Sequence, residues 1–144
     1  TLLRAGAEIC GYEIREDFAN NAKENVEKFL GGDALKNYDV HLRDAYESIE
    51  HTGFDRAVLD IPEPWQVVPH LLDSLRKGGI LVAYNPSIMQ VSKLRDILAS
   101  GPWSMVESVE VMHRGWHVEG HAVRPDHRMV GHTGFLTHAR LLNH

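Results

Sequence analysis

The segment that best indicates the fold is Val58-Leu59-Asp60-Ile61-Pro62-Glu63-Pro64-Trp65. A short apolar run ends here in a carboxylate, and the two prolines that follow keep the chain from continuing as a helix. Such a turn is typical of the sheet edge at which open α/β folds hold their ligands, beyond the carboxyl ends of parallel strands. This makes Asp60 a candidate site residue. Alternatively, Asp60 only caps the next helix, because Asp is a favoured N-cap and Pro64 suits a first helical position.

Strand and helix patterns alternate on both sides of this segment. Apolar runs predict strands at residues 8–14, 38–42, 54–60 and 80–84. Helical spacing of apolar side chains, ended by glycine pairs or by Gly101-Pro102, predicts helices at 18–30, 67–75 and 88–98. This alternation predicts an α/β fold with a doubly wound, mostly parallel sheet, in one domain that covers residues 1–144.

Helical spacing disappears after Trp103. Residues 105–111 and 134–141 predict two strands, and the polar stretch between them, 113–131, is expected to be irregular. Two strands without a helix between them suggest an antiparallel pair at the edge of the sheet. A nicotinamide-binding domain would continue the alternation and carry a G-x-G-x-x-G fingerprint, which this sequence lacks. The sequence therefore favours the Rossmann-like class I methyltransferase sheet, mostly parallel with an antiparallel last strand.

Composition and charge exclude several classes of protein. Apolar residues make up 43% and charged residues 24% of the chain, and no apolar run could span a bilayer, so no membrane association is expected. The single cysteine, Cys10, cannot form an internal disulfide, and no signal-peptide pattern occurs, which indicates a reducing cytoplasm. The net charge of −5 argues against coating nucleic acid through bulk charge, although residues 113–140 carry four arginines against two acids.

Other polar side chains occupy strand ends as Asp60 does. Glu13 closes the first predicted strand, where an acid can accept hydrogen bonds from a ribose diol, and Asp44 follows the second strand. Tyr84 ends the fourth. A solvated carboxylate or a core tyrosine explains each of these positions equally well. A zinc site is not predicted, because no cysteine lies near the four histidines in question and their spacing matches no ligand template: His117, His121, His127 and His132.

Four longer stretches carry a family resemblance. They are Tyr12-Glu13-Ile14-Arg15-Glu16-Asp17-Phe18; Leu59 to Trp65; Val82-Ala83-Tyr84-Asn85-Pro86-Ser87 with Gln90-Val91; and Arg124-Pro125-Asp126-His127-Arg128-Met129 running into Gly131-His132-Thr133-Gly134-Phe135-Leu136. Together they resemble the tRNA N1-adenine methyltransferase family, which methylates the T-loop adenine, adenine-58, with S-adenosylmethionine. The last stretch, from Arg124 to Leu136, is the most specific, because cofactor binding in general does not require such a sequence.

The resemblance implies a role for each candidate residue. Asp60 would lie beside the cofactor and hydrogen-bond the exocyclic amine of the target adenine, whose ring gains positive charge as N1 is alkylated. Tyr84 would pack against the base once it is extruded from the tRNA loop. Glu13 would hold the cofactor ribose, and Asp44 the cofactor's adenine amine. A last group would bind RNA phosphates, unless its histidines hydrogen-bond backbone instead: Arg124, His127, Arg128 and His132.

The same resemblance implies a homotetramer and a longer protein. Family members carry an RNA-contacting N-terminal domain, then a first strand with a Gly-rich cofactor loop, and this sequence is expected to begin after both. A sheet member between strands 8–14 and 54–60 would then be missing, and the chain by itself would bind cofactor weakly. Two alternatives stay open. One is a non-catalytic tRNA-binding subunit of the same fold, against which Asp60 argues, and the other is a small-molecule methyltransferase.

Overall fold

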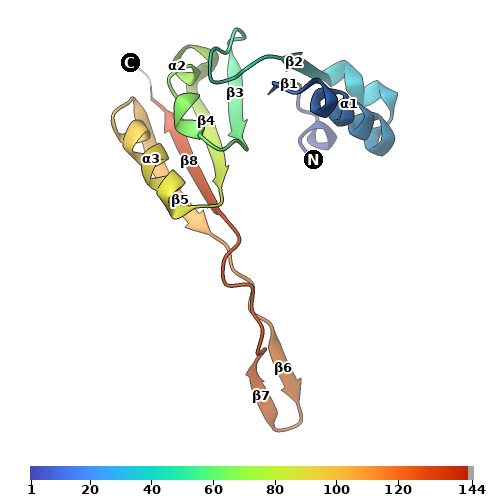
Figure 1. The fold of residues 1–144 in the computed structure, drawn as a ribbon, viewed down its shortest axis with the longest axis vertical. Coiled ribbons are helices and arrows are strands. Elements are labelled where there is room, and N and C mark those ends of the chain that lie inside the picture. The colour runs from blue at the N-terminus through green and yellow to red at the C-terminus, as the bar shows by residue number, and fades with distance from the viewer. Residues whose placement is uncertain (143–144) are drawn as a thin grey trace. The chain divides into compact units, whose positions relative to one another are not determined.

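A computed structural model describes residues 1–142 of the chain, which divides into two units, Thr1–Ser48 and Ile49–His144 (Figure 1). The first unit holds a two-stranded sheet, and the second holds a four-stranded sheet and a small two-stranded one. None of the described helices is long and apolar enough to cross a membrane.

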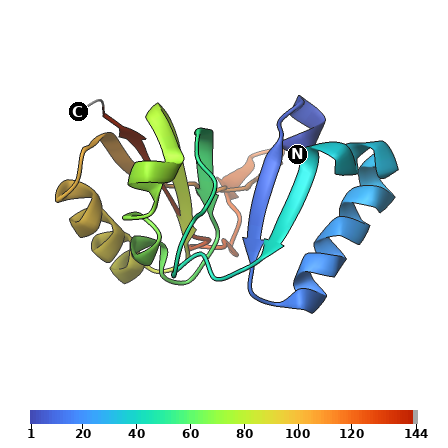
Figure 2. The same ribbon diagram turned by 90° about the horizontal axis from the view of Figure 1, so that it is seen from above.

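The first unit is built as strand, helix and strand. β1 (Ile9–Glu13) and β2 (Tyr38–Leu42) pair in parallel, and they are connected by α1 (Glu16–Leu30) and the 3-10 helix η2 (Gly32–Asn37) (Figure 2). A first 3-10 helix, η1 (Leu3–Ala5), ends at Gly6, whose φ of 83° is one that glycine adopts readily. The two predicted strands and the predicted helix between them are therefore confirmed.

The second unit is built on the four-stranded sheet. Its strands, in the spatial order β3-β4-β8-β5, are β3 (Phe54–Leu59), β4 (Leu75–Asn85), β8 (Phe135–Leu141) and β5 (Trp103–Glu110). β3 and β4 pair in parallel, whereas β8 pairs antiparallel with both β4 and β5. The α/β fold with an antiparallel last strand is thus confirmed.

Helices cover one face of the four-stranded sheet (Figure 2). The 3-10 helix η3 (Pro64–Gln66) and the short α2 (Leu71–Ser74) link β3 to β4, and α3 (Ile88–Ala99) links β4 to β5. The side chains of Leu71, Leu81 and Leu94 are at most 1% exposed in this core. Burying one leucine of this kind contributes about 1.5–3 kcal/mol to folding, so this face anchors the edge at which Asp60 and Tyr84 lie.

The sequence predicts one sheet for the whole chain, and this is wrong. β1 and β2 form a sheet of their own, and among the described residues β3 pairs along one edge only, with β4. Neighbouring strands belong to one sheet only when the N–H and C=O groups of their backbones form hydrogen bonds with each other. The further strand between β1 and β3 that the family resemblance implies stays a prediction.

The helix predicted at 67–75 is much shorter than expected. Pro69 supplies no N–H to a helical ladder, so only Leu71–Ser74 form α2, and Leu75 already begins β4. The apolar stripe that suggested the helix is buried all the same, since Val67 and Val68 are at most 2% exposed. The apolar periodicity therefore predicted correctly that these side chains are buried, but it predicted a longer helix than the one that forms.

The stretch predicted to be irregular contains a second hairpin. β6 (Trp116–Glu119) and β7 (Ala122–Pro125) pair antiparallel next to Gly120, whose φ is 52°. Figure 1 shows this hairpin joined to the larger sheet through two connecting segments, 111–115 and 126–134. The last two strands of the larger sheet form an antiparallel pair at its edge, as predicted. β5 is the outermost strand, and β8 lies between β4 and β5, where it satisfies the backbone groups of both.

Candidate active site

Asp60 and Tyr84 lie at the carboxyl edge of neighbouring parallel strands. Leu59 of β3 pairs in register with Ala83 of β4, and each candidate residue comes next along its strand. Asp60 is exposed, and within the described part of the chain its carboxylate makes no hydrogen bond or ion pair. A charged acceptor at this edge is therefore available to a ligand.

The structure decides against helix capping by Asp60. The next helical turn, η3, begins at Pro64, and its N-cap residue is Glu63. No side chain makes a capping hydrogen bond at this turn. The alternative reading of Asp60 as a simple N-cap is therefore wrong.

Gln90 holds the proline turn that follows Asp60. Its Nε2 donates to the carbonyl oxygen of Pro62 over 2.9 Å, and its Oε1 accepts from the N–H of Ser87 over 3.1 Å. Ser87 Oγ accepts from the N–H of Met89 over 3.2 Å, so Ser87 and Gln90 form a capping box at the start of α3. One glutamine thus caps a helix and fixes the loop that carries Asp60.

Tyr84 contacts the segment that leads into β8. Its hydroxyl donates to the carbonyl oxygen of Thr133 over 3.1 Å. Its ring lies against the backbone of Gly134, where a Cβ atom would overlap the ring. The side chain is nevertheless 40% exposed, which argues against a plain core tyrosine. The run His132-Thr133-Gly134 therefore forms one wall beside Tyr84.

His132 hydrogen-bonds through both ring nitrogens. Nδ1 lies 2.6 Å from Glu110 Oε1, and Nε2 lies 2.6 Å from the carbonyl oxygen of Pro86. The Phe135 ring lies beside it, with the centroids 5.3 Å apart. The hydrogen bond to Glu110, followed by the bond to Pro86, raises the pKa of His132 above its ordinary value. The contact with Pro86 agrees with the alternative in which this histidine bonds backbone.

The other residues predicted to contact RNA lie on or after the small hairpin. Arg124 belongs to β7, and His127 and Arg128 follow in the segment that returns to the sheet. All three are exposed. Arg128 also lines, together with Asp126, a hollow of about 380 Å³ between the two connecting segments. The three cationic or titratable side chains stay candidates for phosphate contacts.

Glu13 and Asp44 lie at the carboxyl edge of the first unit's sheet. The carbonyl oxygen of Glu13 accepts from the N–H of Arg43, immediately before Asp44, over 3.0 Å. Both carboxylates are half-buried and accept a local N–H, from Arg15 at 2.9 Å for Glu13 and from Tyr46 at 2.8 Å for Asp44. These bonds orient the carboxylates and leave further lone pairs for ligand donors. A site shared with Asp60, which belongs to the second unit, stays a prediction.

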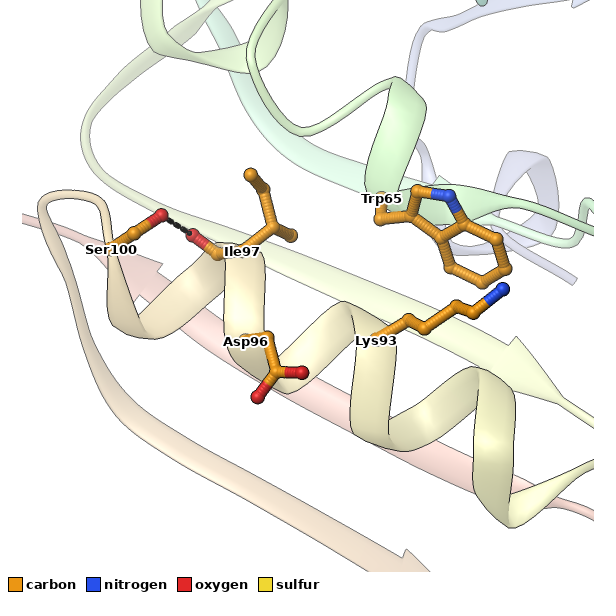
Figure 3. Close-up of a pocket in the computed structure, with 5 residues that line it drawn as sticks. All are labelled: Trp65, Lys93, Asp96, Ile97 and Ser100. Carbon is orange, nitrogen blue, oxygen red and sulfur yellow. Dashed lines mark hydrogen bonds between the residues drawn. The ribbon is translucent and has the colours of Figure 1, made fainter.

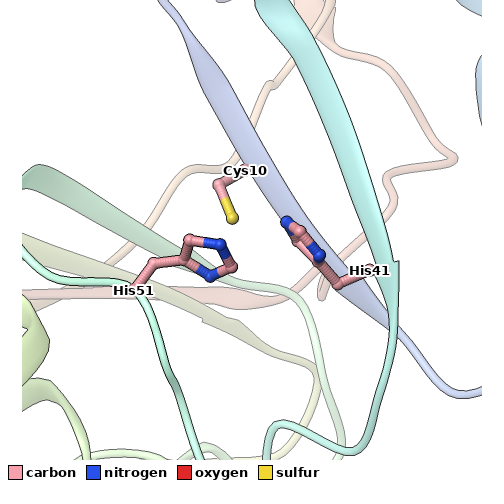
Figure 4. Close-up of side chains that lie close together, drawn as sticks. All are labelled: Cys10, His41 and His51. Atoms are coloured by element: carbon pink, nitrogen blue, oxygen red, sulfur yellow. The ribbon is translucent and has the colours of Figure 1, made fainter.

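Cys10 and His41 lie on the neighbouring strands β1 and β2, with the Sγ atom within 4.8 Å of a ring nitrogen (Figure 4). His51, the third side chain drawn there, belongs to the second unit. Burial, and after it the charge of Asp39, raises the pKa of the Cys10 thiol. The thiolate needed for metal binding or nucleophilic attack is therefore disfavoured.

Figure 3 shows a hollow beside α3. It has a volume of about 480 Å³ and is lined by Trp65, Lys93, Asp96, Ile97 and Ser100. The Lys93 ammonium lies 5.0 Å from the Trp65 ring centroid in a cation–π contact. Neither Asp60 nor Tyr84 lines this hollow, so it is distinct from the candidate active site.

Three residues of the site region were given no role by the sequence-based reasoning. Gln90 could have been found from the Ser-x-x-Gln spacing that marks a capping box. Glu110 could not, because it lies 22 residues from its partner His132. Asn85 is fully buried at the end of β4, and its amide has no hydrogen-bond partner within residues 1–142.

The α/β layers, with the antiparallel strand β8 between β4 and β5, are those of a class I methyltransferase fold. The structure is similar to that of an S-adenosylmethionine-dependent O-methyltransferase from Thermotoga maritima, with a TM-score of 0.86 and 27% identity, covering 99% of this chain and 54% of that one. It is also similar to the tRNA (m1A58) methyltransferase TrmI from Aquifex aeolicus, with a TM-score of 0.78 and 29% identity, covering 95% of this chain and 54% of that one.

Residues 9–123 match the family described as the tRNA methyltransferase complex GCD14 subunit, and the chain belongs to this family. The chain is also 31% identical, over 92% of its length and 55% of the relative's, to the tRNA (adenine(57)-N(1)/adenine(58)-N(1))-methyltransferase TrmI of Methanocaldococcus jannaschii. The expected family resemblance is thus confirmed. The chain spans about half the length of the curated relatives it matches.

Proposed function

We propose that the protein transfers a methyl group from S-adenosylmethionine to N1 of adenine-58 in tRNA, the position for which its relatives are named. The observation that carries this proposal is Asp60, an exposed carboxylate without a protein partner in the described chain, beside Tyr84 at the ligand edge of the sheet. A subunit that only binds tRNA has no need of a carboxylate there, which favours a catalytic role.

The proposed reaction asks the protein mainly to position its substrate. S-adenosylmethionine supplies a methyl group on a sulfonium that is already activated, so no covalent enzyme nucleophile is needed. Asp60 accepts a hydrogen bond from the exocyclic amine of the target adenine and stabilises the positive charge that the ring gains. Tyr84, which is 40% exposed, offers a ring face on which the extruded base stacks.

The acids of the first unit fit the nucleoside end of this cofactor. Glu13 and Asp44 offer acceptor oxygens, and a ribose diol and an adenine amine present donors. We assign the ribose to Glu13 and the amine to Asp44. Both side chains are half-buried and already oriented by one backbone N–H each, at 2.9 Å and 2.8 Å, which lowers the entropy they lose on binding.

Two exposed arginines and an exposed histidine around the small hairpin support an RNA surface. Arg124, His127 and Arg128 would contact phosphates, for which the arginine fork suits the geometry. Because the whole chain carries a net charge of −5, such contacts must come from a local cluster. Replacing Arg124 and Arg128 together by glutamine is expected to weaken tRNA binding and to lower its salt dependence.

We also propose that the protein is a cytoplasmic homotetramer. The hairpin leaves large apolar side chains exposed, at 58% for Trp116, 70% for Val118 and 59% for Val123, and a grouped apolar surface of this kind marks an interaction site. Further copies of the chain would cover it. A single cysteine is typical of a reducing compartment. Light scattering after size exclusion is expected to give four chains per particle, and a monomer would contradict this.

One observation favours a second function, small-molecule methyl transfer. The structural relative from Thermotoga maritima, with the TM-score of 0.86, is named as an O-methyltransferase. A small hydroxyl-bearing acceptor would need neither the exposed arginines nor extrusion of a base. The two functions therefore differ in the methyl acceptor, which is tRNA in one and a small hydroxyl compound in the other.

The test is methyl transfer by the protein to a tRNA transcript and to the same transcript with guanosine in place of adenine-58. Mass spectrometry of the digested RNA is expected to show N1-methyladenosine in the first transcript only. Equal transfer to both transcripts, or transfer to small hydroxyl compounds with none to tRNA, would contradict the proposal.

A further inference from the structure

The two ring nitrogens of His132 both face oxygen atoms that can only accept. Glu110 Oε1 lies 2.6 Å from Nδ1, and the carbonyl oxygen of Pro86 lies 2.6 Å from Nε2. A neutral imidazole donates from one nitrogen only, whereas an imidazolium donates from both. The geometry therefore selects the protonated form of His132, and a neutral ring would turn a lone pair toward one of the two oxygens.

His132 joins three segments that are distant in sequence. Pro86 follows β4, Glu110 ends β5, and His132 itself lies just before β8. The next residue, Thr133, offers the carbonyl oxygen that accepts from the Tyr84 hydroxyl over 3.1 Å. Gly134 then lies against the Tyr84 ring, at a place where no Cβ atom would fit. His132 thus ties this wall to β5 and to the end of β4 through two short contacts, whereas the bond from Thr133 Oγ1 to the carbonyl oxygen of Val111 is longer, at 3.4 Å.

We propose that His132 is a positioning residue whose imidazolium clamps the Thr133-Gly134 wall against Tyr84 and releases it when the ring loses its proton. His132 does not contact the substrate in this role, and it acts through Thr133 and Tyr84. The proposal rests on the proposed function only for its effect on methyl transfer. The clamp itself is a property of the folded chain.

The groups around the ring fix the direction of the pH dependence. Glu110 from β5 is the charged group that faces it, Tyr84 from β4 reaches it only through Thr133, and Pro86 and Phe135 bring no charge. The pKa of His132 is raised above its ordinary value by Glu110 and then by Pro86. The clamp is therefore fully formed below the ordinary histidine pKa and is lost as the pH rises through the higher pKa of the folded state.

The chain offers a matched control in His138. Its Nε2 lies 3.1 Å from Glu107 Oε2, so it also forms a histidine–glutamate pair between β8 and β5. The described contacts of His138 include no second acceptor and no residue of the Tyr84 wall. His138→Gln should therefore leave the wall and the activity unchanged.

The experiment is a pH series on the full protein, in which nuclear magnetic resonance follows the histidine rings and the proton contacts between the Tyr84 ring and Gly134. We expect His132 to titrate above an ordinary histidine, and Glu110→Gln to lower that midpoint. Nuclear Overhauser contacts between the Tyr84 ring and the Gly134 Hα atoms, which the close approach of ring and backbone allows, should be lost across the titration. In His132→Gln these contacts should be weak at every pH, and in His138→Gln they should follow the wild type.

Two results would overturn the clamp. One is an ordinary midpoint for His132 in the wild type. The other is a set of contacts between Tyr84 and Gly134 that do not change with pH or in Glu110→Gln. On tRNA, His132→Gln should lower kcat and leave cofactor affinity unchanged. If the protein does not methylate tRNA while the histidine midpoints and the Tyr84–Gly134 contacts behave as expected, the proposed function fails and the clamp stands.

Discussion

Asp60 and Tyr84 are the residues that follow Leu59 and Ala83, a register pair of the parallel strands β3 and β4, so both leave the sheet at the same edge. The strand register alone therefore places a carboxylate and an aromatic ring at neighbouring positions of this edge. On the proposed function, one would bind the edge of the target base and the other its face. Replacing Asp60 should therefore lower the rate of methyl transfer, whereas replacing Tyr84 should raise the KM for tRNA.

Tyr84→Phe and Tyr84→Ala separate the ring from the hydroxyl. Phenylalanine keeps the stacking surface and loses only the hydrogen bond to Thr133, so we expect a small effect on the KM for tRNA. Alanine also loses stacking, which is worth roughly 1–3 kcal/mol per base, so KM should rise about tenfold or more. Steady-state kinetics on tRNA measure both. Equal effects of the two variants would show that the ring has no stacking role.

Gly134→Ala should destabilise the protein. A Cβ atom at position 134 would overlap the Tyr84 ring, and overpacking of this kind costs about 1–3 kcal/mol. Gly131→Ala is the matched control three residues earlier, because a Cβ atom at that position meets nothing within 4 Å. Thermal unfolding should show a lower melting temperature for the first variant only. Equal melting temperatures would mean that Tyr84 does not pack as described.

Glu13→Gln and Asp44→Asn should each weaken binding of S-adenosylmethionine by about tenfold or more, because each replaces a charged acceptor by a neutral amide. Asp33→Asn in the same unit is the control, since Asp33 is exposed and pairs only with Lys36 in the described contacts. Calorimetric titration of the full protein measures all three. Affinity unchanged in both test variants would remove these acids from the cofactor site.

The 144-residue chain by itself should bind S-adenosylmethionine weakly. Within the described residues β3 has no partner on its outer edge, and no strand pairing links its sheet to the sheet of Glu13 and Asp44, so the proposed acids lack a common support. The same titration, carried out on this chain and on one extended to the length of its relatives, tests the point. Micromolar affinity of the 144-residue chain would prove this prediction wrong.

Local patterns predicted the strands well and the contacts between segments poorly. The runs before Asp44 and Asp60 were apolar enough to show strands ending in acids, and β2 and β3 are found there. The same kind of pattern failed at 67–75, because one proline outweighs apolar spacing. The clamp at His132 depends on Pro86 and Glu110, 46 and 22 residues away, and no local pattern reports such distances.

The most direct test of the account is single-turnover methylation of tRNA by the protein with Asp60→Ala, measured together with thermal unfolding and cofactor affinity. Because the Asp60 carboxylate makes no hydrogen bond or ion pair within the described chain and caps no helix, stability and cofactor affinity should stay close to the wild type. Loss of one charged contact made in the transition state should slow methyl transfer by about a hundred- to a thousandfold. A folded variant that methylates adenine-58 at the wild-type rate would contradict the account.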